Sequence, residues 1–151
     1  MSKESILVSQ SGADTFTSAS ISTGLTADGK AGWNVIAIEA YWADAASVPA
    51  ADWSLSAVCQ TVATATLFGE DDEVARVSWG VQNTAGVAVA YQYEPYKASI
   101  LFEPRVTVQP TIYFGVASSN TGQSNNLICV VYYEIVKLSD IEVLRLLAGG
   151  A

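Results

Sequence analysis

Strand-like segments fill almost the whole chain, and the one segment with helical character comes last. The strand-like segments are short apolar or alternating runs separated by turn residues, at intervals of about ten residues. They cover residues 5–10, 14–23, 33–42, 53–61, 62–68, 74–81, 87–93, 99–103, 105–108, 111–117 and 127–138. This spacing predicts an all-β fold of roughly eight strands, either a two-sheet sandwich or a barrel.

Two of these segments are apolar on both faces. In the run from Trp33 to Trp42, odd and even positions project to opposite sides of a regular strand, and both sets are largely apolar. The run from Leu127 to Leu138 is the longest apolar strand of the chain. We expect both strands to lie inside a sheet, and we expect the second face of the first run to be covered by tertiary packing or by another subunit.

The last segment has the signature of a short helix. Ser139 and Glu142 have the spacing of a capping box, and Gly149-Gly150 ends the pattern. A helix of two to three turns is not stable alone, so it must dock on its own sandwich or on a neighbour. The resulting division is an N-terminal arm or edge strand over 1–12, a β-sandwich over 13–138, and a short helix and tail over 139–151 within one domain.

The composition contains more apolar residues than one small domain readily buries. Hydrophobic residues make up 50% of the 151 residues and charged residues only 15%, whereas soluble domains average about 25% charged residues. Large exposed apolar patches mark interaction sites, so we expect contacts with other copies rather than a monomer with a Ser/Thr-rich surface. The interface candidates are Ile6, Leu7, Val8, Trp42, Trp53, Trp79, Ile141, Leu144 and Leu147.

The residue set offers little equipment for catalysis. Histidine is absent, which removes the commonest general base and rules out the usual serine triad. Three carboxylates, Glu39, Glu103 and Glu134, lie in or beside predicted strands, but no spacing selects two of them as a glycosidase-like pair. We therefore expect no enzyme, no catalytic residue and no cofactor.

For each of two further groups of residues, the sequence leaves two interpretations open. The acidic run Glu70, Asp71, Asp72 and Glu73 is a weak candidate for a cation-binding loop, and a hydrated loop is the favoured interpretation. Cys59 and Cys129 lie in apolar runs, where buried reduced thiols are expected and a single bridge between packed strands is the alternative.

The net charge of -8 is unfavourable for contact with a phosphate backbone, so direct binding of nucleic acid is not expected. The first ten residues lack the apolar core of a signal peptide, and no apolar run reaches the roughly 18 residues of a membrane span. These features predict synthesis in the cytoplasm, while contact with a membrane stays an open alternative.

With a polar lead-in, about eight strands and a long turn-rich middle, nearly the whole chain resembles in layout the single jelly-roll coat proteins of small icosahedral viruses and phages. The C-terminal part carries most of the resemblance, in Ser99–Pro104, Pro110–Val116, the closing strand Cys129–Leu138 and the helix after it. It implies an antiparallel jelly-roll sandwich that assembles with copies of itself, and with other structural proteins, into the capsid of a virion. Many such proteins carry a basic arm for the genome, which this chain lacks.

Two alternatives to a capsid protein remain at this point. The first is a filament or surface-layer subunit with the same sandwich. The second is a carbohydrate-binding module that uses surface tryptophans.

Overall fold

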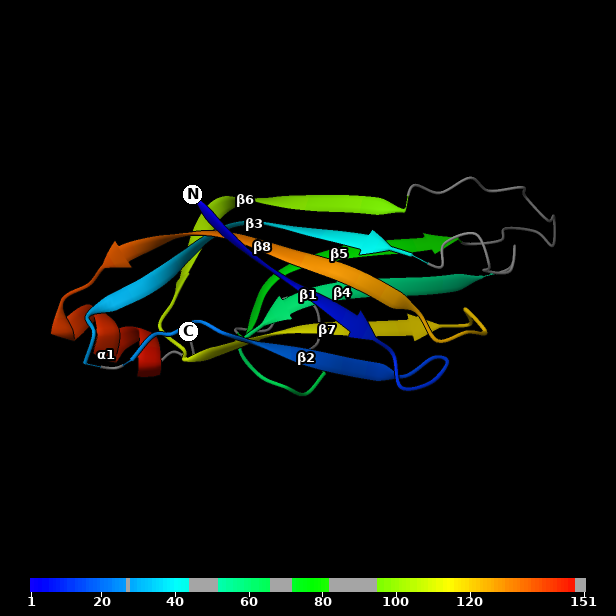
Figure 1. The fold of residues 1–151 in the computed structure, drawn as a ribbon, viewed down its shortest axis with the longest axis horizontal. Helices are drawn as coiled ribbons and strands as arrows, with labels where there is room; N and C mark the ends of the chain where they lie inside the picture. The colour runs from blue at the N-terminus through cyan, green and yellow to red at the C-terminus, as the bar shows by residue number, and fades with distance from the viewer. Residues whose placement is uncertain (27, 44–51, 66–71, 82–94, 149–151) are drawn as a thin grey trace.

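The computed structural model describes residues 1–26, 28–43, 52–65, 72–81 and 95–148. The described residues form eight strands and one helix, as Figure 1 shows. These are β1 (Ser2–Ser9), β2 (Phe16–Ser22), β3 (Ala31–Trp42), β4 (Trp53–Gln60), β5 (Glu73–Val81), β6 (Tyr96–Thr107), β7 (Thr111–Ser119), β8 (Asn126–Lys137) and α1 (Asp140–Ala148). The predicted strand over 87–93 lies outside the described residues, and residues 61–65 are not part of a strand.

The strands form two four-stranded sheets, which we call the first sheet (β1-β8-β3-β6) and the second sheet (β2-β7-β4-β5). Every neighbouring pair is antiparallel. This strand order is that of a jelly roll, so the predicted fold class is confirmed. The helix α1 follows β8 and lies at one end of the sandwich (Figure 1). As expected, β8 and β3 lie in the interior of a sheet.

The regular alternation predicted for β3 is wrong beyond Val35. Trp33 and Val35 point into the core, but the next inward residues are Ile38, Ala40 and Trp42. The pairing register of β3 shifts between Val35 and Ala37 on both of its neighbours. A bulge adds one residue to a strand, so each later side chain points to the opposite face from the one that regular alternation predicts. In a strand that is apolar on both faces, the sequence does not indicate where such a bulge lies.

A proline such as Pro104 indicates a strand end or a sheet edge, and here it marks an edge: β6 continues through this residue and joins the segments predicted at 99–103 and 105–108. β6 is an edge strand, and its pairing with β3 passes from Ile100 opposite Ala37 to Arg105 opposite Val35. Pro104 therefore lies in an irregular part of an edge, where a missing N–H breaks no ladder bond.

At the other edge of the first sheet, β1 pairs with β8 along its full length, from Ser2 to Ser9. The end of β1 and the start of β8 are joined by a buried polar network. Asn125 donates to Gln10 Oε1 at 2.7 Å and accepts from Trp42 Nε1 at 3.0 Å. Because buried amides are costly without partners, this network fixes how the chain leaves β1 and how it enters β8.

Candidate functional site: the outer face of the first sheet

The outer face of the first sheet is apolar. Its registers align three successive rows across the four strands. From β1 to β6 the rows are Leu7, Ile128, Tyr41 and Tyr96; Ser5, Val130, Glu39 and Ala98; and Lys3, Tyr132, Ala37 and Ile100. We call these positions the apolar face; Lys3 and Glu39 are its only charged members. Ile100, for example, is 80% exposed.

The outer face of the second sheet has the opposite character. Serine is the commonest residue at the outward positions of its strands, as at Ser18, Ser20, Ser22, Ser54, Ser56, Ser78 and Ser119. The Phe16 ring lies over Gly115, and the Val58 side chain also borders this glycine. The segment after β4 also folds onto this face, where Ser18 Oγ donates to the Ala63 carbonyl at 2.9 Å. One side of the sandwich is therefore suited to water and the other is not.

Glu39 stands near the middle of the apolar face. It is half-buried, and its carboxylate accepts hydrogen bonds from Tyr96 at 2.8 Å and Tyr132 at 3.0 Å. The bond to Glu39 is the main reason that the pKa of each phenol is raised, with desolvation second. Within the described residues no lysine or arginine forms an ion pair with Glu39. The face thus carries one negative charge, held by neutral donors.

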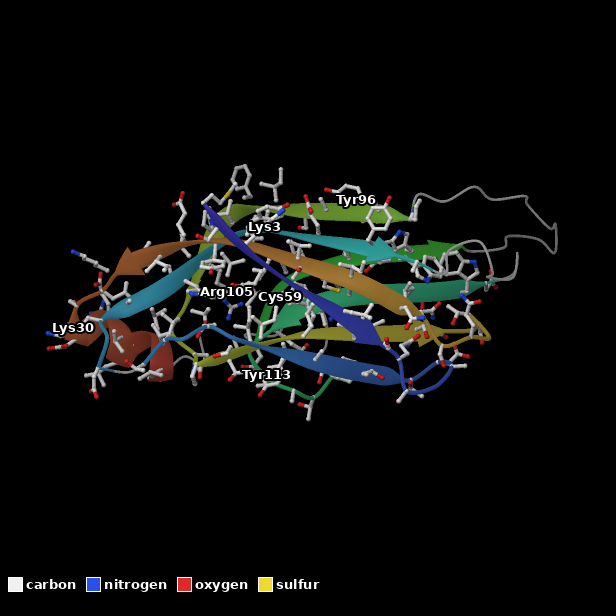
Figure 2. The ribbon with its side chains drawn as sticks, in the orientation of Figure 1. Lys3, Lys30, Cys59, Tyr96, Arg105 and Tyr113 are labelled. Atoms are coloured by element: carbon white, nitrogen blue, oxygen red, sulfur yellow. The ribbon has the colours of Figure 1, made fainter. Side chains whose placement is uncertain are left out.

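Two hollows adjoin Glu39 on this face. The smaller, of about 120 Å³, is lined by Glu39, Ala40, Tyr41, Tyr96, Ile128 and Val130. The larger, of about 370 Å³, is lined by Met1, Ile36, Ala37, Glu39, Tyr96, Ala98, Ile100 and Tyr132. Tyr96, like Glu39, lines both hollows, and Figure 2 shows this residue on β6 at the rim of the sheet. The hollows are open and mostly apolar, which suits inserted side chains better than a catalytic reaction.

The helix α1 carries a second exposed apolar surface. Its start is fixed by the predicted capping box, because Ser139 N donates to Glu142 Oε2 at 2.6 Å and Glu142 N to Ser139 Oγ at 3.3 Å. These bonds lower the pKa of Glu142. Val143 is buried against the sandwich, whereas Ile141 and Leu144 are 64% and 65% exposed. The helix packs on the sandwich with one side only and exposes isoleucine and leucine side chains on the other, so its exposed side is a candidate for a contact with another protein.

The predicted interface residues divide between surface and core. In β1, Leu7 lies on the apolar face, Ile6 is half-buried and Val8 is buried. Leu147 is exposed together with Ile141 and Leu144. The three tryptophans proposed for contacts are buried, and Trp42 packs on the other two. The centroid of its ring lies 5.3 Å from that of Trp53 and 5.8 Å from that of Trp79. They form core, and they are not at the surface of the subunit.

Sequence reasoning missed most of the apolar face. Tyr41, Tyr96, Ile100 and Ile128 were not among the candidates, although all four are exposed. The outward phase of β8 could have revealed Ile128, since Leu127 and Cys129 on either side of it are plainly core residues. Tyr41 could not be found in this way, because the bulge in β3 reverses its face.

The predicted cation loop gains no support from its described half. Glu70 and Asp71 lie outside the described residues. Glu73 pairs with Arg76 at 3.2 Å, and its carbonyl accepts from Arg105. The part of the chain that the structure describes holds no cluster of three or more His, Cys, Asp or Glu side chains suited to a metal ion.

Cys59 and Cys129 are free and buried in the structure, in agreement with the expected reduced thiols. Burial raises the pKa of each thiol to about 12. Among the described residues, no helix is long and apolar enough to cross a membrane.

No protein-family model and no curated protein matches the sequence. The structure resembles that of VP1 from Trichodysplasia spinulosa-associated polyomavirus, with a TM-score of 0.52 and 7% identity over 90% of this chain and 96% of that chain. The chain has the fold of a viral coat protein. A match to VP2 of infectious bursal disease virus covers 87% of this chain and 33% of that one, with 12% identity and a TM-score of 0.32, too low to support a shared fold. The predicted resemblance to coat proteins is thus confirmed for the fold.

Proposed function

We propose that this protein is a self-assembling shell subunit, the capsid protein of a virus or phage. The observation that carries the proposal is the contrast between the two outer faces of the sandwich. The apolar face exposes large side chains on all four strands, whereas the opposite face is rich in serines and has fewer large exposed apolar side chains. Monomers rarely expose large contiguous apolar patches, so another protein surface is expected to cover this face in use.

The fold and the charge support the same proposal. The jelly roll is shared with a polyomavirus VP1, and a rigid two-layer unit with one apolar face is well suited to tiling with its copies. The net charge of -8 argues that the protein does not hold nucleic acid directly. A second structural protein or a membrane would then line the shell, and the protein would reside in the virion after synthesis in the cytoplasm.

The alternatives have less support. All four tryptophans are buried, so a carbohydrate-binding platform made of surface tryptophans has no exposed ring to use. Catalysis is not part of the proposal: histidine is absent, Glu39 is bound by two tyrosines, and Glu103 and Glu134 are simply exposed. A filament or surface-layer subunit uses the same apolar face and differs only in whether the assembly closes.

Electron microscopy of the purified protein in negative stain, together with light scattering after size exclusion, tests the proposal. We expect closed or ring-like particles many times the subunit mass of 15.9 kDa. Open fibres would favour the filament instead. A single species of subunit mass across salt and pH would refute both assembly proposals.

A further inference from the structure

Covering the apolar face creates an electrostatic requirement at Glu39. This carboxylate is half-buried, and no cation among the described residues is paired with it. Its two tyrosine partners are neutral donors. A charge removed from water inside an interface is costly unless an opposite charge meets it. The surface that covers this face must therefore bring a cation to Glu39, surrounded by apolar side chains.

A second apolar face in two-fold pairing does not meet this requirement. Glu39 lies in the middle row and on an inner strand of the face, whereas Lys3 lies at a corner. Two-fold pairing centred on the face would hold the two Glu39 side chains within about one strand spacing, ~4.8 Å, of each other along the sheet. Both carboxylates would be desolvated together, and each Lys3 would stay at the edge.

The chain offers few cations that could do better. It has 7 lysines and arginines in total. Four of them have partners within the described residues: Lys30 with Asp140, Arg76 with Glu73, Arg105 with the Glu73 carbonyl, and Lys97 with the Trp79 ring. Of the other three, Lys3 belongs to the face itself and Lys137 ends β8. Arg145, which interacts electrostatically with Glu142, is the one of these three that lies on an exposed apolar surface outside the face, that of α1.

The side of α1 that faces solvent matches the apolar face in composition. Ile141, Leu144, Arg145 and Ala148 follow the i, i+3, i+4, i+7 pattern of one helix face, opposite the buried Val143. This stripe places one guanidinium beside two large apolar side chains. Arginine suits such a position because it is weakly hydrated and can bind both oxygens of a carboxylate.

The two surfaces also match in size. The nine residues of α1 form a helix about 13.5 Å long and 10–12 Å wide. Four strands at ~4.8 Å spacing and three rows at two-residue intervals give the face an extent of about 14 Å in each direction. One helix of this length covers the face without a large remainder.

We propose that α1 of one copy docks on the apolar face of a neighbouring copy, with Arg145 against Glu39 and with Ile141 and Leu144 in the adjoining hollows. The proposal rests on the proposed function, that of a self-assembling subunit. The helix is held on its own sandwich, since Leu138 N donates to the Lys30 carbonyl at 2.7 Å and Val143 is buried. The contact therefore joins two copies through different surfaces, which generates a ring or an extended array.

Site-directed cross-linking tests this contact. Ala98 lies opposite Glu39 on the face and Ala148 lies on the exposed stripe of α1, and both are exposed. The two native thiols are buried with a pKa of about 12, so introduced cysteines are the reactive ones. Ala98→Cys and Ala148→Cys proteins are mixed, allowed to assemble, and treated with a short bifunctional maleimide. We expect the 98–148 product to dominate. A dominant 98–98 product would show face-to-face pairing and overturn the proposal.

Charge exchange provides the second arm. Arg145→Glu should raise the protein concentration needed for half-assembly by about tenfold or more, because it sets two carboxylates against each other in the contact. Combining it with Glu39→Arg should recover most of that loss. Lys137→Glu makes the same change of charge on β8 and should have little effect. Thermal unfolding confirms that each subunit is folded.

The outcomes separate the two proposals. If particles form but the 98–148 product is missing and Arg145→Glu assembles normally, helix docking is wrong and the shell subunit stands. If the unmodified protein never assembles, both proposals fail.

Discussion

A single carboxylate on the apolar face should block assembly without harming the fold. In the Ile100→Glu variant, the substituted side chain is already 80% exposed in the subunit. Full burial of an isoleucine contributes about 1.5–3 kcal/mol, so the folded subunit should lose no more than about 0.6 kcal/mol. A neighbour that covers the remaining surface would gain roughly 1–2.5 kcal/mol from this residue alone. That gain is lost in the variant, and an unpaired carboxylate is desolvated as well.

The matched control is Ser20→Glu, which adds the same charge to an exposed outward position of the opposite sheet. Both variants carry a net charge one unit more negative than the -8 of the unmodified chain, so general repulsion is equal. Light scattering across a concentration series should show that Ile100→Glu requires at least about tenfold more protein for half-assembly, since 1.4 kcal/mol corresponds to a factor of ten. Ser20→Glu should shift little. Equal behaviour of the two variants would refute the assignment of the contact to the apolar face.

Three further predictions concern the subunit itself. Gly115→Ala should lower the free energy of unfolding by about 1–3 kcal/mol in denaturant titrations, because the added Cβ would lie 2.5 Å from a ring carbon of Phe16. Gly12→Ala is the near-neutral control, since the closest atom to its added Cβ is 3.7 Å away. Both native thiols should resist a thiol reagent at pH 8 and react once the chain is unfolded, because their pKa is about 12; rapid labelling of the folded protein would contradict their burial. Glu39→Gln should lower the raised pKa of Tyr96 and of Tyr132, so phenolate absorbance should develop at lower pH than in the unmodified protein. An unchanged titration curve would show that Glu39 does not raise the pKa of these phenols.

The same phenols make a pH-dependent contribution in the folded subunit. Because their pKa is raised in the folded state, their contribution to stability is fully present below the ordinary tyrosine pKa of about 10. It is lost as the pH rises through the raised value.

The local elements of this fold follow from local chemistry. Trp53, Leu55, Ala57 and Cys59 stand at alternate positions of the sequence, and all four are core residues of β4. The capping box around Ser139 was predicted by spacing alone, since its two bonds join residues three apart. Such features depend on neighbours in the sequence, which is why the sequence reveals them.

The apolar face depends on features that are not local. A bulge after Val35 turns Tyr41 outward and Trp42 inward, and nothing in an apolar strand marks where a bulge falls. The tryptophans were predicted at contacts because large aromatics are common there, yet a two-sheet core also needs large side chains. Glu39 could not be recognised as a central charge until the register brought Tyr96 and Tyr132 beside it.

Oxidative footprinting of the dilute and the assembled protein is the most direct test that copies meet through the apolar face. Tyr41 and Ile128 on this face should be labelled readily in the dilute subunit and strongly protected in the assembly. Tyr113, which projects from the serine-rich side, should be labelled equally in both (Figure 2). Protection of Tyr113 with unchanged labelling of Tyr41 and Ile128 would contradict the account.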